Sequence, residues 1–193
     1  VNFVPNTTTI NFNANTGSGT MTSQTHTYDD PLTLNLNQFT KEDNIFTGWN
    51  TASNGSGTKY SDGGTIGATS YPTESTATLY AQWYYGKAIG TSGGCAWKID
   101  HDGKMTIYPE GGGTCTLGSD TGEEMPWASY SDQIISIEVQ KGVNAYENCS
   151  ELFAYLENVK SIDISDLHTS DVEYMSSMFY NCSSLTSVNL SNL

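Results

Sequence analysis

The chain has 193 residues with 21 acidic side chains, seven lysines and no arginine, which gives a formal net charge of −14. The negative charge, and the lack of a guanidinium group to pair with phosphate or guanine, disfavour nucleic acid and anionic membrane surfaces as partners. Apolar runs are far shorter than the roughly 20 residues of a membrane span, and abundant Thr, Ser, Asn, Gly and Tyr favour an extracellular protein of short strands and turns.

Residues 10–83 are expected to form one small β module. Strand patterns, mostly alternating apolar and polar residues, occur in four segments: 10–14, 32–36, 46–50 and 79–83. Glycine-rich turns separate them. Phe46, Trp49 and Trp83 are expected in the core, and the alternative is an exposed platform on which sugar rings stack.

Four strings occur in order in this module: I-N-F-N-A-N, F-T-G-W-N-T-A, G-S-G-T-K-Y-S-D-G and L-Y-A-Q-W. Together they resemble the Listeria–Bacteroides repeat of bacterial surface proteins. The resemblance implies a β-grasp-like fold that serves as a repeated spacer without enzymatic activity. We therefore expect residues 1–85 to be a first domain of this type.

Residues 84–94 are expected to be a Gly- and Ser-containing joint, and residues 86–193 a second domain. A hairpin is predicted over residues 95–108, because Asp102-Gly103 supplies the positive φ angles of a tight turn. An EF-hand reading of this turn fails, since the glycine comes too early and the distal glutamate is missing. Cys95 and Cys115 flank the hairpin, and a disulfide between them or two free thiols both fit the sequence.

Apolar residues recur at a fixed interval in the last third of the chain. Six of them return 26 positions later: Leu152, Phe153, Val159, Ile162, Ile164 and Leu167 become Met178, Phe179, Leu185, Val188, Leu190 and Leu193. Such a period marks a solenoid, in which each coil buries its apolar side chains against its neighbours. The spacing L-x-x-V-x-L-x-x-L in residues 185–193 is that of a leucine-rich-repeat coil, and the hairpin and the Pro126-Trp127 segment are expected to cap the first coil.

One helix is expected, over residues 171–179. Ser170 and Glu173 form a capping box, and apolar residues follow at helical spacing, among them Met175 and Met178. The methionines are expected to face the core, and the alternative is an adaptable binding surface. The predicted fold class is thus mainly β with minor α: a β-grasp-like module followed by a hairpin-capped leucine-rich-repeat solenoid with short parallel strands.

The C-terminal region carries a second resemblance. T-S-D-V-E-Y-M-S-S-M-F-Y-N-C-S-S-L-T-S-V-N-L-S-N-L and the preceding L-F-A-Y-L-E-N-V-K-S-I-D-I-S are similar to the BspA-like leucine-rich repeats of bacterial surface proteins. The match covers about 130–193 and extends to the hairpin from residue 95, although residues 134–150 lack the T-S-x-V and M-x-x-M-F strings. It implies display at the cell surface or cell wall, adhesion or recognition, and a longer parent protein with more coils.

The predicted binding surface is the outward face of the solenoid strands. It comprises Ser136, Glu138, Lys160, Ser161, Asp163, Ser187 and Asn189. A polar, acidic face suits a basic protein of a host or neighbouring cell, or divalent cations; the alternative is a solvated sheet without a ligand. The open end at residues 185–193 is expected to self-associate, because an unpaired strand edge is adhesive.

The sequence shows no catalytic motif, cofactor fingerprint or metal-ligand spacing. Gly90-Thr91-Ser92-Gly93-Gly94 faintly resembles the string around a serine-protease nucleophile, but it lies between two small modules and lacks a suitable partner domain. We therefore expect a non-enzymatic surface-protein fragment for adhesion or protein recognition, without catalytic residues, cofactor or metal. A purely structural stalk and a carbohydrate-binding accessory module of an extracellular enzyme are the alternatives.

Overall fold

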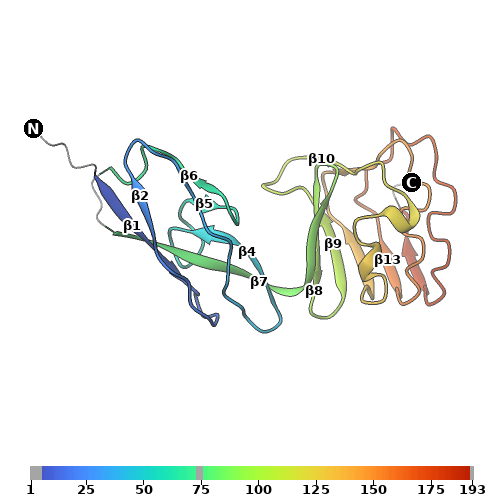
Figure 1. The fold of residues 1–193 in the computed structure, drawn as a ribbon. Coiled ribbons are helices and arrows are strands. Elements are labelled where there is room, and N and C mark those ends of the chain that lie inside the picture. Colours follow the sequence, from blue (N-terminus) through green and yellow to red (C-terminus); the bar gives the residue numbers. More distant parts are fainter. Residues whose placement is uncertain (1–5, 73–75, 192–193) are drawn as a thin grey trace, which may run out of the picture. The chain divides into compact units, whose positions relative to one another are not determined.

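The computed structural model of the chain describes residues 6–72 and 76–191 (Figure 1). The chain divides into two units, Val1–Tyr85 and Gly86–Leu193. Regular structure in the described residues is almost entirely β, since the helical elements there are two short 3-10 turns, η1 (Gly122–Glu124) and η2 (Ala128–Tyr130). The fold is therefore mainly β, as predicted.

The first unit is built on a mixed sheet. Its strand β1 (Thr7–Asn13) lies parallel to the start of β7 (Thr76–Ser92) and antiparallel to β2 (Gln24–Thr27). On the other side of β7, strand β4 (Asn44–Asn50) pairs antiparallel with β7 and with β5 (Lys59–Tyr60). The strand order within this unit is thus β2-β1-β7-β4-β5.

Aromatic rings fill the core of the first unit. Trp49 is 1% exposed, and its ring centroid lies 4.9 Å from those of Phe12 and Phe46. Trp83 is half-buried against the same cluster, and its indole N–H donates to the carbonyl oxygen of Ala14 at 2.8 Å. The predicted core position of Trp49 is confirmed, so Trp49 is not an exposed sugar platform, whereas Phe46 and Trp83 pack against the core and are half-buried.

The predicted strand at 32–36 is much shorter in the structure. Strand β3 (Leu32–Thr33) pairs with β6 (Thr65–Ile66) and then ends, and Leu36 is 67% exposed. The backbone N–H groups of Asn35 and Asn37 donate to side-chain oxygens at 2.8 Å. Side-chain acceptors thus satisfy donors that a longer strand would have used in a ladder.

The boundary between the two units lies within the predicted joint, but residues 84–92 are part of strand β7, so a break in regular structure there was predicted wrongly. The last part of β7 pairs antiparallel with β8 (Cys95–Asp100), with a register shift between Gly86 and Ala88. A Cβ on Gly90 would lie 2.4 Å from the Trp97 ring of the partner strand. Glycine is needed at this position to admit a cross-strand indole ring, and its presence in the sequence does not signal flexibility here.

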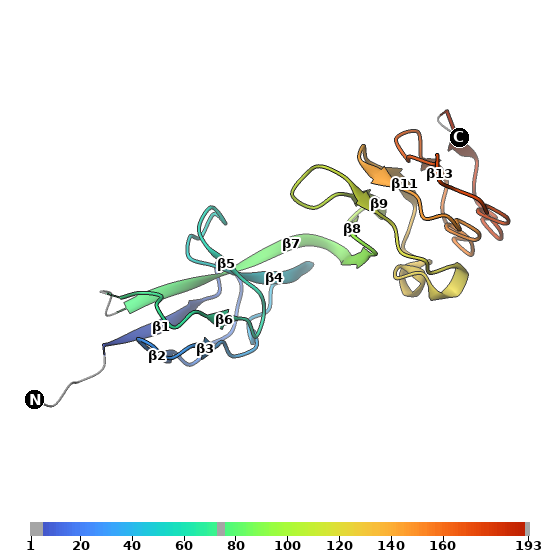
Figure 2. The ribbon, with the colours of Figure 1, turned by 90° about the horizontal axis from the view of Figure 1, so that it is seen from above.

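The second unit begins with the predicted hairpin of β8 and β9 (Lys104–Tyr108). Parallel strands then follow side by side: β11 (Ser136–Val139) next to β9, β13 (Ser161–Asp163) next to β11, and β14 (Ser187–Asn189) next to β13. Figure 2 shows β9, β11 and β13 in succession. We call β9, β11, β13 and β14 the parallel ladder. The short parallel strands expected from the sequence are present.

Further backbone contacts run beside the ladder. Strand β10 (Cys115–Thr116) lies parallel to β12 (Val143–Asn144), and single parallel bridges join Asn144 to His168 and Asn148 to Tyr174. A disulfide joins Cys95 to Cys115, with their Cα atoms 5.1 Å apart. It ties the start of the hairpin to the strand that begins this second row of contacts.

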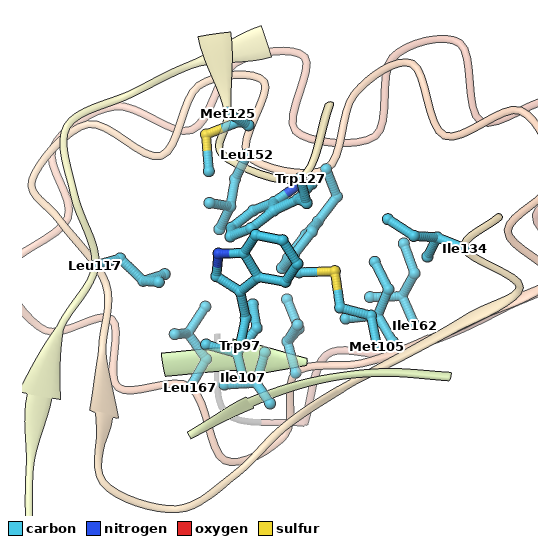
Figure 3. Close-up of a cluster of buried hydrophobic side chains, with 14 of the residues drawn as sticks. Trp97, Met105, Ile107, Leu117, Met125, Trp127, Ile134, Leu152, Ile162 and Leu167 are labelled. Atoms are coloured by element: carbon cyan, nitrogen blue, oxygen red, sulfur yellow. The ribbon is translucent and has the colours of Figure 1, made fainter. Parts of the chain in front are cut away.

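The core of the second unit repeats from layer to layer. The rings of Trp127, Phe153 and Phe179 stack at 6.1 and 6.3 Å, each 26 residues from the next. Trp97 and Trp127 pack edge to face at 6.2 Å in the centre of a larger apolar cluster, which Figure 3 shows with Met105, Ile107, Ile134 and Ile162. Each layer therefore covers the apolar side chains of the layer before it.

The last described layer is less well covered. Ile162 and Ile164 are buried, as predicted, but Val188 is half-buried and Leu190 is 42% exposed. The partial exposure of Val188 and Leu190 fits the predicted open edge, because β14 pairs with β13 and, among the described strands, with no other. Leu193, the final apolar position of the predicted repeat, lies outside the described residues.

The helix predicted at 171–179 is absent; these residues form turns. The backbone N–H groups of Glu173 and Tyr174 donate to the carbonyl oxygen of Glu147, 2.7 and 3.0 Å away in the preceding layer. In a helix, these two N–H groups would instead have been used in the N-terminal cap and the first turn. Of the predicted methionine stripe, Met178 is buried and Met175 is 43% exposed.

Candidate recognition surface

The parallel ladder brings six of the seven predicted binding residues onto one face. Strand pairing places them in two rows, Ser136–Ser161–Ser187 and Glu138–Asp163–Asn189. Ile137 and Ile162, which alternate with them, are 3% and 1% exposed. Because successive side chains of a strand point to opposite faces, the two rows point outward. Lys160 is exposed and lies one residue before β13.

Lys160 holds neighbouring layers together through its backbone. Its N–H donates to the carbonyl oxygen of Ile135 at 2.8 Å, and its own carbonyl oxygen accepts from Thr186 N–H at 3.0 Å. The Thr186 hydroxyl donates to the same oxygen at 3.0 Å. The backbone at Lys160 is thereby fixed, while its long side chain extends from the entrance of the strand.

The face continues onto strand β9 of the hairpin. The hairpin was predicted from the sequence, but its contribution to this face was not. Lys104 on β9 forms an ion pair with Glu138 on β11. Both side chains are more than two-fifths exposed, so the pair contributes at most about 0.2–1 kcal/mol. Alternation with the fully buried Met105 and Ile107 was a signal that Lys104 and Thr106 share a face. Recognising it required placing β9 parallel to β11.

Asp163 carries the best-defined carboxylate of the face. Its Oδ1 accepts hydrogen bonds from the Ser165 hydroxyl at 2.7 Å and from the Ser165 N–H at 3.0 Å. These two hydrogen bonds, and a weaker one from the Asn189 side chain, hold the pKa of Asp163 below its ordinary value. Asp163 and Asn189 are direct neighbours in the pairing of β13 with β14.

The second unit carries a net negative charge. Residues 86–193 contain five lysines and fifteen acidic side chains, a formal charge of −10 with histidine neutral. Across the described residues, no cluster of three or more His, Cys, Asp or Glu is arranged to hold a metal ion. The ladder face offers hydroxyl, amide and carboxylate groups at strand spacing, all of which can form hydrogen bonds.

Ser92, the serine of the protease-like string, has a structural role. It is 2% exposed, and its hydroxyl oxygen accepts a hydrogen bond from Gly118 N–H at 3.1 Å. A buried hydroxyl that is used to fix a neighbouring loop is not presented to a substrate.

Within the part of the chain that is described, no helix has the length and apolar character needed to cross a bilayer.

Comparison with known families supports one of the two resemblances. No curated protein and no solved structure matches the chain. No family match supports the BspA-like resemblance of residues 95–193, which therefore stays a prediction. Residues 9–82, nearly the whole of the first unit, match the Listeria-Bacteroides repeat domain, a repeat domain associated with bacterial surface proteins.

Proposed function

We propose that the chain is part of a non-enzymatic bacterial surface protein that recognises a protein partner outside the cell. In this proposal the β-grasp-like first unit is a spacer, and the second unit is a capped leucine-rich-repeat solenoid of the BspA-like kind. The family match of residues 9–82 supports the surface location. The single observation that carries the binding role is the outward double row of polar side chains on the parallel ladder.

The test is attachment of beads coated with the whole chain to bacterial or host cells. The variant Glu138→Ala/Asp163→Ala/Asn189→Ala removes one outward row and should reduce attachment at least about tenfold, if the row supplies a few charge-assisted hydrogen bonds. The matched control, Asp30→Ala/Asn35→Ala/Glu42→Ala, removes the same residue types from exposed positions of the first unit and should leave attachment unchanged.

A structural stalk makes a different prediction. Beads coated with the unmodified chain would then attach no better than beads coated with an inert protein, and the binding proposal would be rejected. Equal losses from both triple variants would also reject it, because they would indicate general charge attraction and not a specific face.

A carbohydrate-binding role has one observation in its favour. The first unit contains a pocket of about 500 Å³ lined by uncharged hydroxyl-bearing residues, including Thr51, Thr58, Tyr60 and Tyr71. Tyrosine rings and hydroxyl groups suit a neutral sugar. Binding on a glycan array that is lost in Tyr60→Ala would favour this second candidate, whereas an array without hits would remove it.

Self-association is proposed at the outer edge of β14. Val188 and Leu190 are incompletely covered there, and the strand has a partner on one side within the described region. Light scattering should show a mass that rises with concentration, and Val188→Lys should suppress the rise. A constant monomer mass, with β14 amides well protected from hydrogen exchange, would contradict this.

A further inference from the structure

A cavity of about 420 Å³ lies in the second unit, within the size range of small-ligand sites. One side is formed by the two 3-10 turns and the other by residues 154–156. Most of its walls are apolar or aromatic: Trp127, Ala128, Ala154, Tyr155 and Leu156. Glu123, on η1, is the charged residue of the lining.

The cavity arises where two layers are incompletely joined. The next pair of layers is linked by hydrogen bonds from Phe153 N–H to Met178 O at 2.9 Å and from Tyr155 N–H to Tyr180 O at 2.7 Å. Residues 127–131 and 152–156 are both described, and no backbone hydrogen bond links them. The 3-10 turn of the cap therefore contacts the next layer through side chains, without a backbone hydrogen bond between these two segments.

Small side chains keep this gap open. The ring stack of Trp127, Phe153 and Phe179 sets the correspondence between layers, so Ala128, Ala154 and Tyr180 occupy equivalent positions. The two alanines line the cavity, whereas the third layer has a tyrosine at this position. A larger side chain at residue 128 would reduce the space.

A second carboxylate, that of Glu151, lies next to the lining of the cavity, close to Gly122. A Cβ on Gly122 would lie 2.4 Å from Glu151 Oε2 and 3.6 Å from the Tyr155 ring, so Glu151 reaches the turn that carries Glu123. The pKa of the Tyr155 phenol is raised, first by desolvation and then by the charges of Glu151 and Glu123. Both carboxylates therefore act on Tyr155, which lines the cavity.

We propose that this cavity is a second binding site, separate from the ladder face, that takes a lysine side chain from a basic protein segment. The four-carbon stem of lysine would lie against Trp127 and Leu156, as lysine stems do on apolar surfaces. Its ammonium group would reach Glu123 and Glu151 beside Tyr155, where aromatic ring faces also favour a cation. The charge of −10 on this unit steers such a partner toward it.

The test is an NMR titration of the whole chain with N-acetyl-lysine amide and, in parallel, with N-acetyl-norleucine amide. The norleucine probe has the same straight apolar stem and lacks the ammonium group. The indole N–H of Trp127 and the amide of Tyr155 should shift saturably with the lysine probe, at about millimolar affinity. The norleucine probe should bind about tenfold more weakly or not at all.

Three variants locate the site. Glu123→Gln should weaken binding of the lysine probe about tenfold. Glu124→Gln is the matched control, because Glu124 is an exposed neighbour on the same 3-10 turn; it should leave affinity unchanged. Ala128→Phe should abolish binding by filling the cavity, and if that variant fails to fold, Glu123→Gln still decides the matter.

Several results would overturn the proposal. Equal affinity for both probes would mean that the carboxylates have no role. The absence of saturable shifts at Trp127 would mean that the cavity does not bind the probe. Equal weakening by Glu123→Gln and Glu124→Gln would indicate diffuse attraction. Shifts of the same resonances with Ca²⁺ alone, lost in Glu123→Gln, would assign the carboxylates to a cation instead.

Discussion

The two units of the chain build their hydrophobic cores in different ways. In the first, a single aromatic cluster forms around Trp49, and its members come from segments that are far apart in sequence. In the second, the core is a series of layers, in which Trp127, Phe153 and Phe179 are successive members of one stack. Loss of a side chain should therefore disrupt the whole first unit, but have a graded effect in the second.

Trp49→Ala should have the largest effect. Truncation of a fully buried aromatic residue costs about 3–5 kcal/mol, and Trp49, in contact with three other rings, should lie at the upper end. Hydrogen exchange should show loss of protection throughout β1 and β4, with β11 unchanged. Leu36→Ala, at an exposed position, is the control and should change the free energy of unfolding by less than about 0.5 kcal/mol. An equal loss of protection in β11 would show that the units do not unfold separately.

Substitutions in the ring stack should depend on position. Phe153 is fully buried between two rings, so Phe153→Ala should cost about 3–4 kcal/mol. Phe179 is half-buried and stacks on Phe153, so Phe179→Ala should cost about half as much. Urea unfolding followed by the near-ultraviolet signal measures both. Equal costs would contradict a layered core, because they would mean that the last layer is as well covered as the middle one.

Reduction of the disulfide should destabilise the second unit and leave the stability of the first unit unchanged. Closing a loop with a sequence separation of 20 stabilises the fold by about 3 kcal/mol. All four cysteines lie in the second unit, so a reducing agent should lower the free energy of unfolding of that unit and leave the first unchanged. Cys95→Ala/Cys115→Ala should then be insensitive to the reductant. A change in the first unit on reduction would mean that its stability depends on the second.

The repeat of the second unit could be predicted because apolar residues recur at a fixed period. Their spacing identified Ile162 and Val188 as neighbours in adjacent strands, and the structure pairs them. The helix at 171–179 was predicted wrongly, because local capping residues compete with hydrogen bonds to the preceding layer that no local pattern reveals. Long-range pairing overrides local preference at such positions.

The candidate site was predictable only in part. The outward rows followed from strand alternation, but the partner of Glu138 did not, since Lys104 lies 34 residues earlier and its strand joins the ladder from the hairpin. The cavity beside Trp127 was missed altogether. It depends on how a 3-10 turn packs on the next layer without backbone hydrogen bonds, and no sequence signal apart from the alanines at residues 128 and 154 marks it.

The smallest predicted effect concerns acid stability, again confined to the second unit. The pKa of Asp163 is lower in the folded state than in the unfolded chain, so its ionised form stabilises the fold above its ordinary pKa of about 4. This stabilisation is lost as the pH falls through the folded-state pKa. Asp163→Asn should therefore reduce stability slightly at pH 7 and flatten the loss of stability below about pH 4.

Thermal unfolding of this variant at several pH values, with Asp132→Asn as a control off the ladder, measures the effect. The control should keep the acid sensitivity of the unmodified chain. Hydrogen exchange adds a spatial readout, because Asp163 on β13 is paired with Asn189 on the next strand, β14. If acidification loosens β14 before β11, the layers separate from the open edge inward; if both loosen together, the ladder behaves as one cooperative unit and the contrast with the first unit disappears.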